Sequence, residues 1–151
     1  MKKNILKRVL TLALAALLAL SLFACGKKAD GSESDTKTYK VGICNYVDDA
    51  SLNQIVDNIK TQLAAIGQEK GVTFEISYDN CNADSAVLNQ IIANFIADKV
   101  DLMIGVATPV AVAMQAATEG TNIPVVFAAV SDPVSAGLVE SLEAPGANIT
   151  G

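Results

Sequence analysis

The sequence predicts an α/β fold in which parallel strands alternate with helices, and three observations carry this prediction. After residue 38, short runs rich in β-branched residues alternate with longer runs whose apolar residues recur at helical spacing. The later strand-like runs, residues 102–107 and 123–130, are almost wholly apolar, which is typical of strands buried on both faces. No motif recurs at a fixed period. Four strands joined by three helices predict right-handed crossovers and a Rossmann-like lobe.

The first residues have the pattern of an export signal. Four basic residues lie within the first eight positions, and an apolar run of 14 residues follows at positions 9–22. This run is short for a membrane span, which needs about 20 residues. Ala24 and Cys25 come next, and a small residue before a cysteine resembles the lipobox of bacterial lipoproteins. We expect residues 1–24 to be a signal peptide and Cys25 to carry the lipid. The alternative is an uncleaved anchor with an incidental cysteine.

The next segment, residues 25–38, is polar and contains no Val, Leu, Ile or aromatic residue, so it predicts a flexible tether. Residues 39–151 are then the folded lobe. After the last predicted strand we expect only a short helix near residues 134–142 and a loop at residues 144–147. The sequence therefore predicts one lobe of a larger protein.

Each predicted element follows from its own residues. Strands are predicted at residues 39–45, 72–79, 102–107 and 123–130, and helices at residues 51–70, 84–98 and 109–118. Gly71 follows the first helix, where a helix stop is expected. Thr108 is predicted to cap the third helix. Pro109 then takes the first helical position, where its missing N–H is tolerated.

Composition excludes several classes of function. The chain has no His, and Arg8 is its only Arg. The commonest general base, His-containing zinc sites and a guanidinium clamp within the lobe are therefore excluded. Beyond residue 8, seven basic residues face sixteen acidic ones, so nucleic acid is not expected as a partner. Glycine-rich phosphate loops are missing after every predicted strand. We expect no enzyme activity, no cofactor and no metal.

Ligands of open parallel sheets bind beyond the carboxyl ends of the strands, where the strand order switches direction. If the order is 2-1-3-4, the loops after the first, third and fourth strands border one crevice. The helix after Thr108 offers free N–H groups at Val110 and Ala111 to an anion. Asp132 is placed to receive an ammonium group, and Tyr46 to stack on a flat ligand.

Each of these residues also has a purely structural interpretation. Thr108 could serve only as a helix cap, Asp132 only as a turn residue, and Tyr46 only as a rim or core aromatic. Asp48 and Asp49 could form a pair of carboxylates, although acids at that position more often begin a helix.

Two cysteines follow the first two predicted strands. Cys44 ends the first, and Cys81 comes just after the second. If these strands are neighbours, the two thiols could meet, and an exported protein permits a disulfide. The alternative is two separate, partly buried thiols.

Seven segments together resemble one family, the amino-terminal lobe of ABC transporter substrate-binding lipoproteins, in particular the group with tryptophan- and tyrosine-binding members. They are Lys40-Val41-Gly42-Ile43, Val47 to Leu52, Val100 to Ile104, Ala107-Thr108-Pro109, Ile123 to Phe127, Val130 to Val134, and Pro145 to Gly151.

The resemblance implies a type I periplasmic-binding fold, here truncated before the second lobe, whose two lobes close on a ligand. It implies ligand contacts at Thr108 and Asp132, then at Tyr46, Asn45 and Ala107. It also implies delivery of a small solute, an amino acid, to an ABC permease. The protein would stand on the outer face of the cell membrane, anchored through Cys25. The alternatives are a sensor ectodomain that binds such solutes, or a flavodoxin-like hydrolase.

Overall fold

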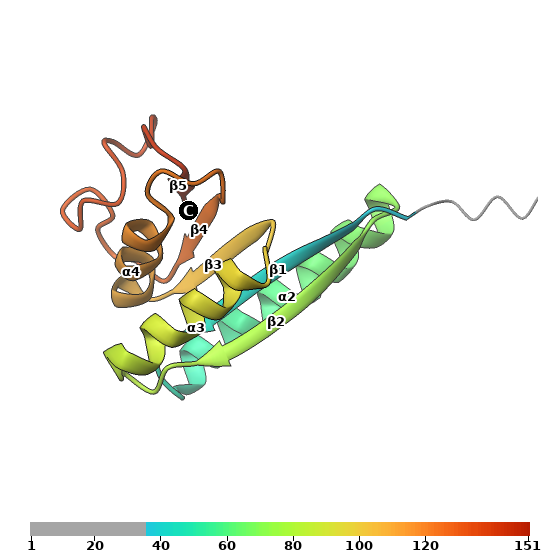
Figure 1. Cartoon of the computed structure of the whole chain (residues 1–151), viewed down its shortest axis with the longest axis horizontal. Coiled ribbons are helices and arrows are strands. Elements are labelled where there is room, and N and C mark those ends of the chain that lie inside the picture. The colour runs from blue at the N-terminus through green and yellow to red at the C-terminus, as the bar shows by residue number, and fades with distance from the viewer. Residues whose placement is uncertain (1–35) are drawn as a thin grey trace, which may run out of the picture. The chain divides into compact units, whose positions relative to one another are not determined.

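The computed structural model describes residues 36–151. The predicted signal peptide, the lipidation at Cys25 and most of the predicted tether lie outside the described residues. The described part forms a five-stranded sheet in the order β2-β1-β3-β4-β5, with every pair parallel (Figure 1). The α/β fold with parallel strands is therefore confirmed. The first four strands have the order 2-1-3-4, which is the condition on which the expected crevice depended, and a fifth strand extends the sheet.

The observed elements match the predicted runs to within a few residues. The strands are β1 (Thr38–Asn45), β2 (Thr73–Asn80), β3 (Leu102–Val106), β4 (Val125–Ala128) and β5 (Ile149–Thr150), and the helices are α2 (Ala50–Lys70), α3 (Ser85–Ala97) and α4 (Thr108–Thr118). Among the described residues, none of these helices is both long and apolar enough to cross a bilayer.

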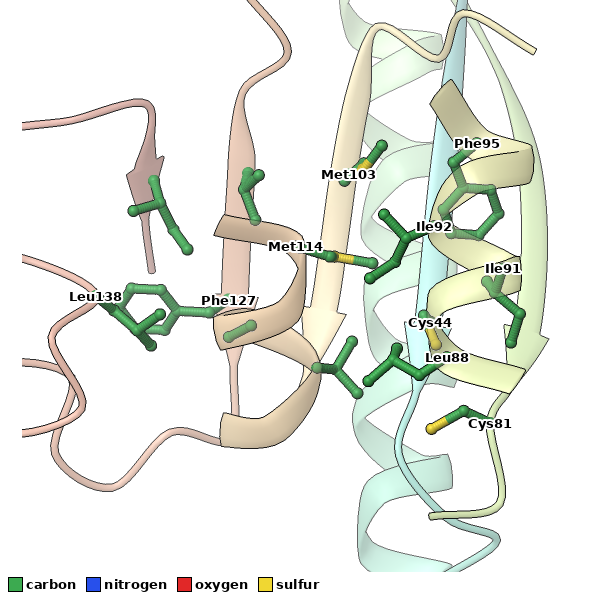
Figure 2. Close-up of a cluster of buried hydrophobic side chains, with 14 of the residues drawn as sticks. Cys44, Cys81, Leu88, Ile91, Ile92, Phe95, Met103, Met114, Phe127 and Leu138 are labelled. Carbon is green, nitrogen blue, oxygen red and sulfur yellow. The ribbon is translucent and has the colours of Figure 1, made fainter. Parts of the chain in front are cut away.

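Helices cover the two faces of the sheet unequally. Helix α2 lies on one face, and α3 and α4 lie on the other (Figure 1). The apolar core is correspondingly divided. One cluster joins the sheet to α3 and α4 through buried side chains such as Ile92, Phe95 and Met114 (Figure 2). The other joins the sheet to α2, where Val56 is the buried helical residue. Burial of these apolar side chains is the main stabilising contribution to the lobe.

Two helices begin with an aspartate that accepts backbone N–H groups. Asp49 accepts from the N–H groups of Ser51 and Leu52 at 2.9 and 3.2 Å, and Asp84 caps α3 in the same way. Each carboxylate satisfies N–H groups that have no partner within the helix. At the other end of α2, Gly71 adopts the left-handed conformation that stops a helix, with φ of 65°, as predicted.

One glycine allows α3 to lie close to the sheet. A Cβ atom on Gly42 of β1 would come within 2.6 to 3.0 Å of three ring atoms of Phe95. The ring of Phe95 is 2 % exposed, so it has little room to move away. The position of α3, and with it the β2–α3 loop, depends on this contact.

The chain after β4 differs from the prediction. Residues 133–137 form consecutive turns, so the short helix predicted near residues 134–142 is wrong. Gly137 has φ of 71°, which a right-handed helix cannot accommodate. The loop predicted at residues 144–147 is confirmed, but the expectation that no strand follows it is wrong, because Ile149 and Thr150 form β5 alongside β4. The side chain of Asn148 anchors this strand by donating to the Ile123 carbonyl at 2.7 Å.

Candidate functional site

Three strands end side by side at the carboxyl edge of the sheet. Asn45 of β1 pairs with Val106 of β3, which pairs with Ala128 of β4. The loops that follow therefore start next to one another. The N–H of Ala107 donates to the Ala128 carbonyl at 2.9 Å and extends the pairing by one residue. The strand order reverses direction between β1 and β3, which is where ligands of open α/β sheets bind.

The start of α4 differs in detail from the prediction. Thr108 is the first helical residue, and Ala107 takes the cap position without a side-chain hydrogen bond, so the predicted threonine cap is wrong. Ala111 is not free either, because its N–H donates to the Ala107 carbonyl at 3.1 Å. The first-turn N–H groups of Thr108 and Val110 have no partner within the helix. Within residues 36–151 the Thr108 hydroxyl has no hydrogen-bond partner either, so this helix end can donate from backbone N–H groups and from a hydroxyl.

Asp132 lies in the turn after β4 and is exposed. Its Oδ1 accepts the backbone N–H of Ser135 at 2.9 Å. Hydrogen bonds from the Ser135 hydroxyl and then from its N–H hold the pKa of Asp132 below its ordinary value. The carboxylate is thus a turn residue, as the structural interpretation has it, and it is also an ionised group facing solvent.

Tyr46 is half-buried at the end of β1, and its ring packs against the core cluster under α3 and α4. Its backbone is held on both sides. The N–H donates to Asn45 Oδ1 at 2.9 Å, and the carbonyl accepts from the N–H of Ala83 at 2.7 Å. The loop that presents Tyr46 is therefore fixed by the strand before it and by the β2–α3 loop beside it.

Asn45 is fully buried, and its amide is used inside the protein. Its Nδ2 donates to the Val47 carbonyl and to Asn53 Oδ1, both at 3.1 Å. Asn53 in turn donates to Asp48 Oδ1 at 2.6 Å. This network joins the end of β1, the following loop and the first turns of α2. In this structure Asn45 can influence a ligand only through the loop that it holds.

The two acids after Tyr46 have separate tasks. Asp49 caps α2 and Asp48 accepts from Asn53, which agrees with the structural interpretation of this pair. Asp48 also borders a polar groove of about 440 Å³ between α2 and the edge strand β2. This groove could not be predicted from the sequence, because its walls come from two elements that are distant in the chain. It contains none of the five predicted ligand residues.

Several non-glycine residues in the loops at this edge have positive φ angles, which their residue types do not predict. Among the described residues, five non-glycine positions have positive φ, and four of them lie in loops that follow β2, β3 or β4. They are Asn82, Ala83, Ala107 and Ala129, with φ between 50° and 83°. Alanine rarely adopts such angles, and strained residues of this kind gather at binding sites. Alanines at these positions carry no sequence signal for the conformation.

The site has the chemistry of a binding edge for a small polar molecule. It offers N–H and hydroxyl donors at the start of α4, a carboxylate at Asp132 and the ring of Tyr46. Among residues 36–151, no three side chains of His, Cys, Asp or Glu gather in a way that could hold a metal ion.

The chain is similar to known proteins in sequence. The family model described as ABC transporter substrate binding protein matches residues 40–151. A tyrosine-binding protein of Clostridioides difficile (strain R20291) is 35% identical over 153 residues, which cover 96% of this chain and 44% of that protein.

Two solved structures have the same fold and related sequences. An ABC domain from Streptococcus pneumoniae in complex with L-Trp is 34% identical, with a TM-score of 0.69, over 76% of this chain and 38% of that one. A conserved domain protein from Vibrio cholerae is 37% identical, with a TM-score of 0.64 and the same two coverages. The chain therefore spans less than half the length of the relatives that it matches.

Proposed function

This chain belongs to the ABC transporter substrate-binding protein family, and from that membership we propose that it captures an amino acid outside the cytoplasmic membrane for delivery to an ABC permease. The observation that carries the proposal is the common edge of β1, β3 and β4, where Tyr46, Thr108 and Asp132 follow adjacent strands.

The three groups suit the two ends of an amino acid. The free N–H groups and the dipole of α4, with the Thr108 hydroxyl, favour a carboxylate. The ionised Asp132 favours an ammonium group, and the ring of Tyr46 offers an apolar surface for the side chain. Ala107 contributes through its backbone, which turns the start of α4 toward the edge, and Asn45 contributes by holding the Tyr46 loop.

The class of solute is supported by the relatives. One is named for tyrosine binding, and one was solved with L-Trp. Because both ligands are zwitterions, they share the carboxylate and ammonium groups that the edge is suited to receive. We therefore assign an L-amino acid as the solute class, with an aromatic side chain as the first candidate.

We further propose that the lobe is held at the membrane by lipid. Residues 1–24 would be removed as a signal peptide, Cys25 would carry a diacylglycerol, and residues 25–38 would connect it to the lobe at residues 39–151. The support is the sequence pattern: basic residues, an apolar run of 14 and Ala24 before Cys25.

The test is isothermal titration of the intact protein with L-tyrosine, L-tryptophan and L-leucine. We expect at least one to bind. We also expect Asp132→Asn and Thr108→Val each to weaken that binding by about 10-fold or more, because a hydrogen bond to a charged group contributes about 1.5–3 kcal/mol.

Asp98→Asn is the matched control, because it removes the same charge at the end of α3, away from the carboxyl edge. Its affinity should equal that of the unmodified protein. If no amino acid binds while another solute does, the proposed solute class is wrong. If both edge variants bind like the control, the site lies elsewhere.

A further inference from the structure

Two buried cysteines lie at the carboxyl ends of β1 and β2, next to the loop that presents Tyr46. Cys44 is the penultimate residue of β1, and Cys81 directly follows β2 (Figure 2). Both are 0% exposed, and both thiols are free. Cys81 is tied to the end of β1 and to the loop after it: its N–H donates to the Asn45 carbonyl at 3.0 Å, and its thiol donates to the Tyr46 carbonyl at 3.2 Å.

The pairing of β1 with β2 places the two cysteines on the same face of the sheet. Cys44 is opposite Asp79 in the parallel register. Side chains alternate along a strand, so Asp79 and the residue two positions later project to the same face as Cys44. That residue is Cys81. Both thiols lie in the buried cluster that joins the sheet to α3 and α4 (Figure 2), and each donates to a backbone carbonyl at the end of β1 or in the loop after it.

We propose that Cys44 and Cys81 form a disulfide when the protein folds outside the cytoplasm, which ties the end of β1 to the β2–α3 loop. This inference uses the extracytoplasmic placement of the proposed function, where disulfides persist. It gives a role to two thiols that the proposed binding site does not use.

The bond forms by exchange with a small disulfide such as oxidised glutathione. One cysteine thiolate attacks a glutathione sulfur and releases one molecule of glutathione thiolate. The second cysteine thiolate attacks the mixed disulfide and releases the other glutathione. The two cysteines lose two protons and two electrons, and one glutathione disulfide becomes two glutathione thiols.

Thiol–disulfide exchange has to occur during folding, before the two thiols become buried. Burial, with the neighbouring Cys81 thiol, raises the pKa of Cys44 to about 12 in the folded lobe. Very little of it is then present as the reactive thiolate at neutral pH. The reduced, folded protein should resist oxidation, and the bond should form while the chain folds.

The disulfide would restrict the loop that presents Tyr46. When it forms, Cys81 loses the thiol hydrogen that it donates to the Tyr46 carbonyl, while the N–H of Ala83 continues to donate to that carbonyl. The covalent bond holds the β2–α3 loop against β1 in place of the thiol hydrogen bond. The loop that presents Tyr46 would then pack against a β2–α3 loop that the disulfide links covalently to β1.

The test is non-reducing peptide mapping after the protein is refolded with oxidised and reduced glutathione. Trypsin should release residues 41–60, which contain Cys44, and residues 71–99, which contain Cys81. We expect them as one linked species that separates on reduction. The linked protein should melt on the order of 10 °C above the reduced protein, since a disulfide limits the unfolded chain.

Cys44→Ala provides the matched control, because it leaves Cys81 in place and cannot form the link. Its melting temperature should be the same with and without reductant. Unlinked peptides, glutathione on either cysteine, or a linked form no more stable than the reduced one would each overturn the proposal. The amino-acid titration is independent of this result, so a failure of one leaves the other to be judged separately.

Discussion

At the scale of single residues, Ser135 lowers the pKa of the proposed ammonium-binding group. Its hydroxyl and N–H donate to the Asp132 carboxylate and hold the pKa of that group below 3.8. Because the folded-state pKa is the lower one, these hydrogen bonds stabilise the fold fully above about pH 4. The contribution is lost as the pH falls through the folded-state pKa.

Ser135→Ala should therefore raise the pKa of Asp132 toward its ordinary value, since the largest cause of the depression is removed and the backbone N–H is kept. Titration of the Asp132 carboxyl carbon by NMR measures the change directly. Ser77→Ala, an exposed serine on β2, is the control and should leave the curve unchanged. An unchanged Asp132 curve in Ser135→Ala would contradict the assigned cause.

The sequence was sufficient to place Thr108 and Asp132 at one edge, because carboxyl ends of parallel strands meet there. It could not predict the positive φ of Ala107, since alanine has no preference for that region. It also could not distinguish an asparagine that touches a ligand from one whose amide is used internally. Asn45 is of the second kind in this structure. The roles of the five residues in binding stay predictions.

At the scale of elements, the packing of α3 on β1 depends on the missing side chain of Gly42. A methyl group there would overlap the ring of Phe95, which is surrounded by other core side chains. Gly42→Ala should lower the free energy of unfolding by about 1–3 kcal/mol, because an overfilled core must shift. Urea denaturation followed by circular dichroism measures this.

Gly105→Ala is the comparison for that prediction. A Cβ atom on Gly105 would lie 3.1 Å from the sulfur of Met114 and 3.2 Å from the backbone nitrogen of Ala111, both longer than the 2.6 Å approach at Gly42. Its effect on the denaturation midpoint should be smaller. A Gly42→Ala protein as stable as the unmodified one would mean that α3 does not depend on this close approach.

Elements with a strong local pattern were predicted well, and elements defined by distant partners were not. Apolar spacing identified α2, α3 and α4, and β-branched runs identified the first four strands. Strand β5 has only two residues and exists because it pairs with β4, so it left no local pattern. The segment near Val134 has apolar residues at helical spacing, but Gly137 turns the chain instead.

At the scale of the whole molecule, the described part is one α/β lobe of the type I periplasmic-binding fold. Its fold class followed from the alternation of strands and helices, because each crossover helix must return the chain to the same end of the sheet. The family followed only from several short segments taken together. No single loop carries that information.

The proposed anchoring makes a prediction for the protein in its cell. Cells fed a radiolabelled fatty acid should incorporate label into the protein, and Cys25→Ser should abolish it and release the protein from the membrane fraction. Cys81→Ser is the control, since a buried lobe cysteine is no acceptor for lipid, and it should keep the label. Label retained by Cys25→Ser would show that the lipid, if present, is attached elsewhere.

The internal amide network of Asn45 has a consequence for how such a protein can diversify. Asn45, which holds the Tyr46 loop from inside, is fully buried, while Thr108 and Asp132 are not, so the residue that supports the loop differs from the residues proposed to bind the ligand. Under the proposed function, exchange of Thr108 or Asp132 would change which solute is preferred without breaking the hydrogen bond that joins Asn45 to Asn53 of α2. The solute specificity of related proteins could therefore change during evolution through single substitutions at these positions, as long as Asn45 is retained.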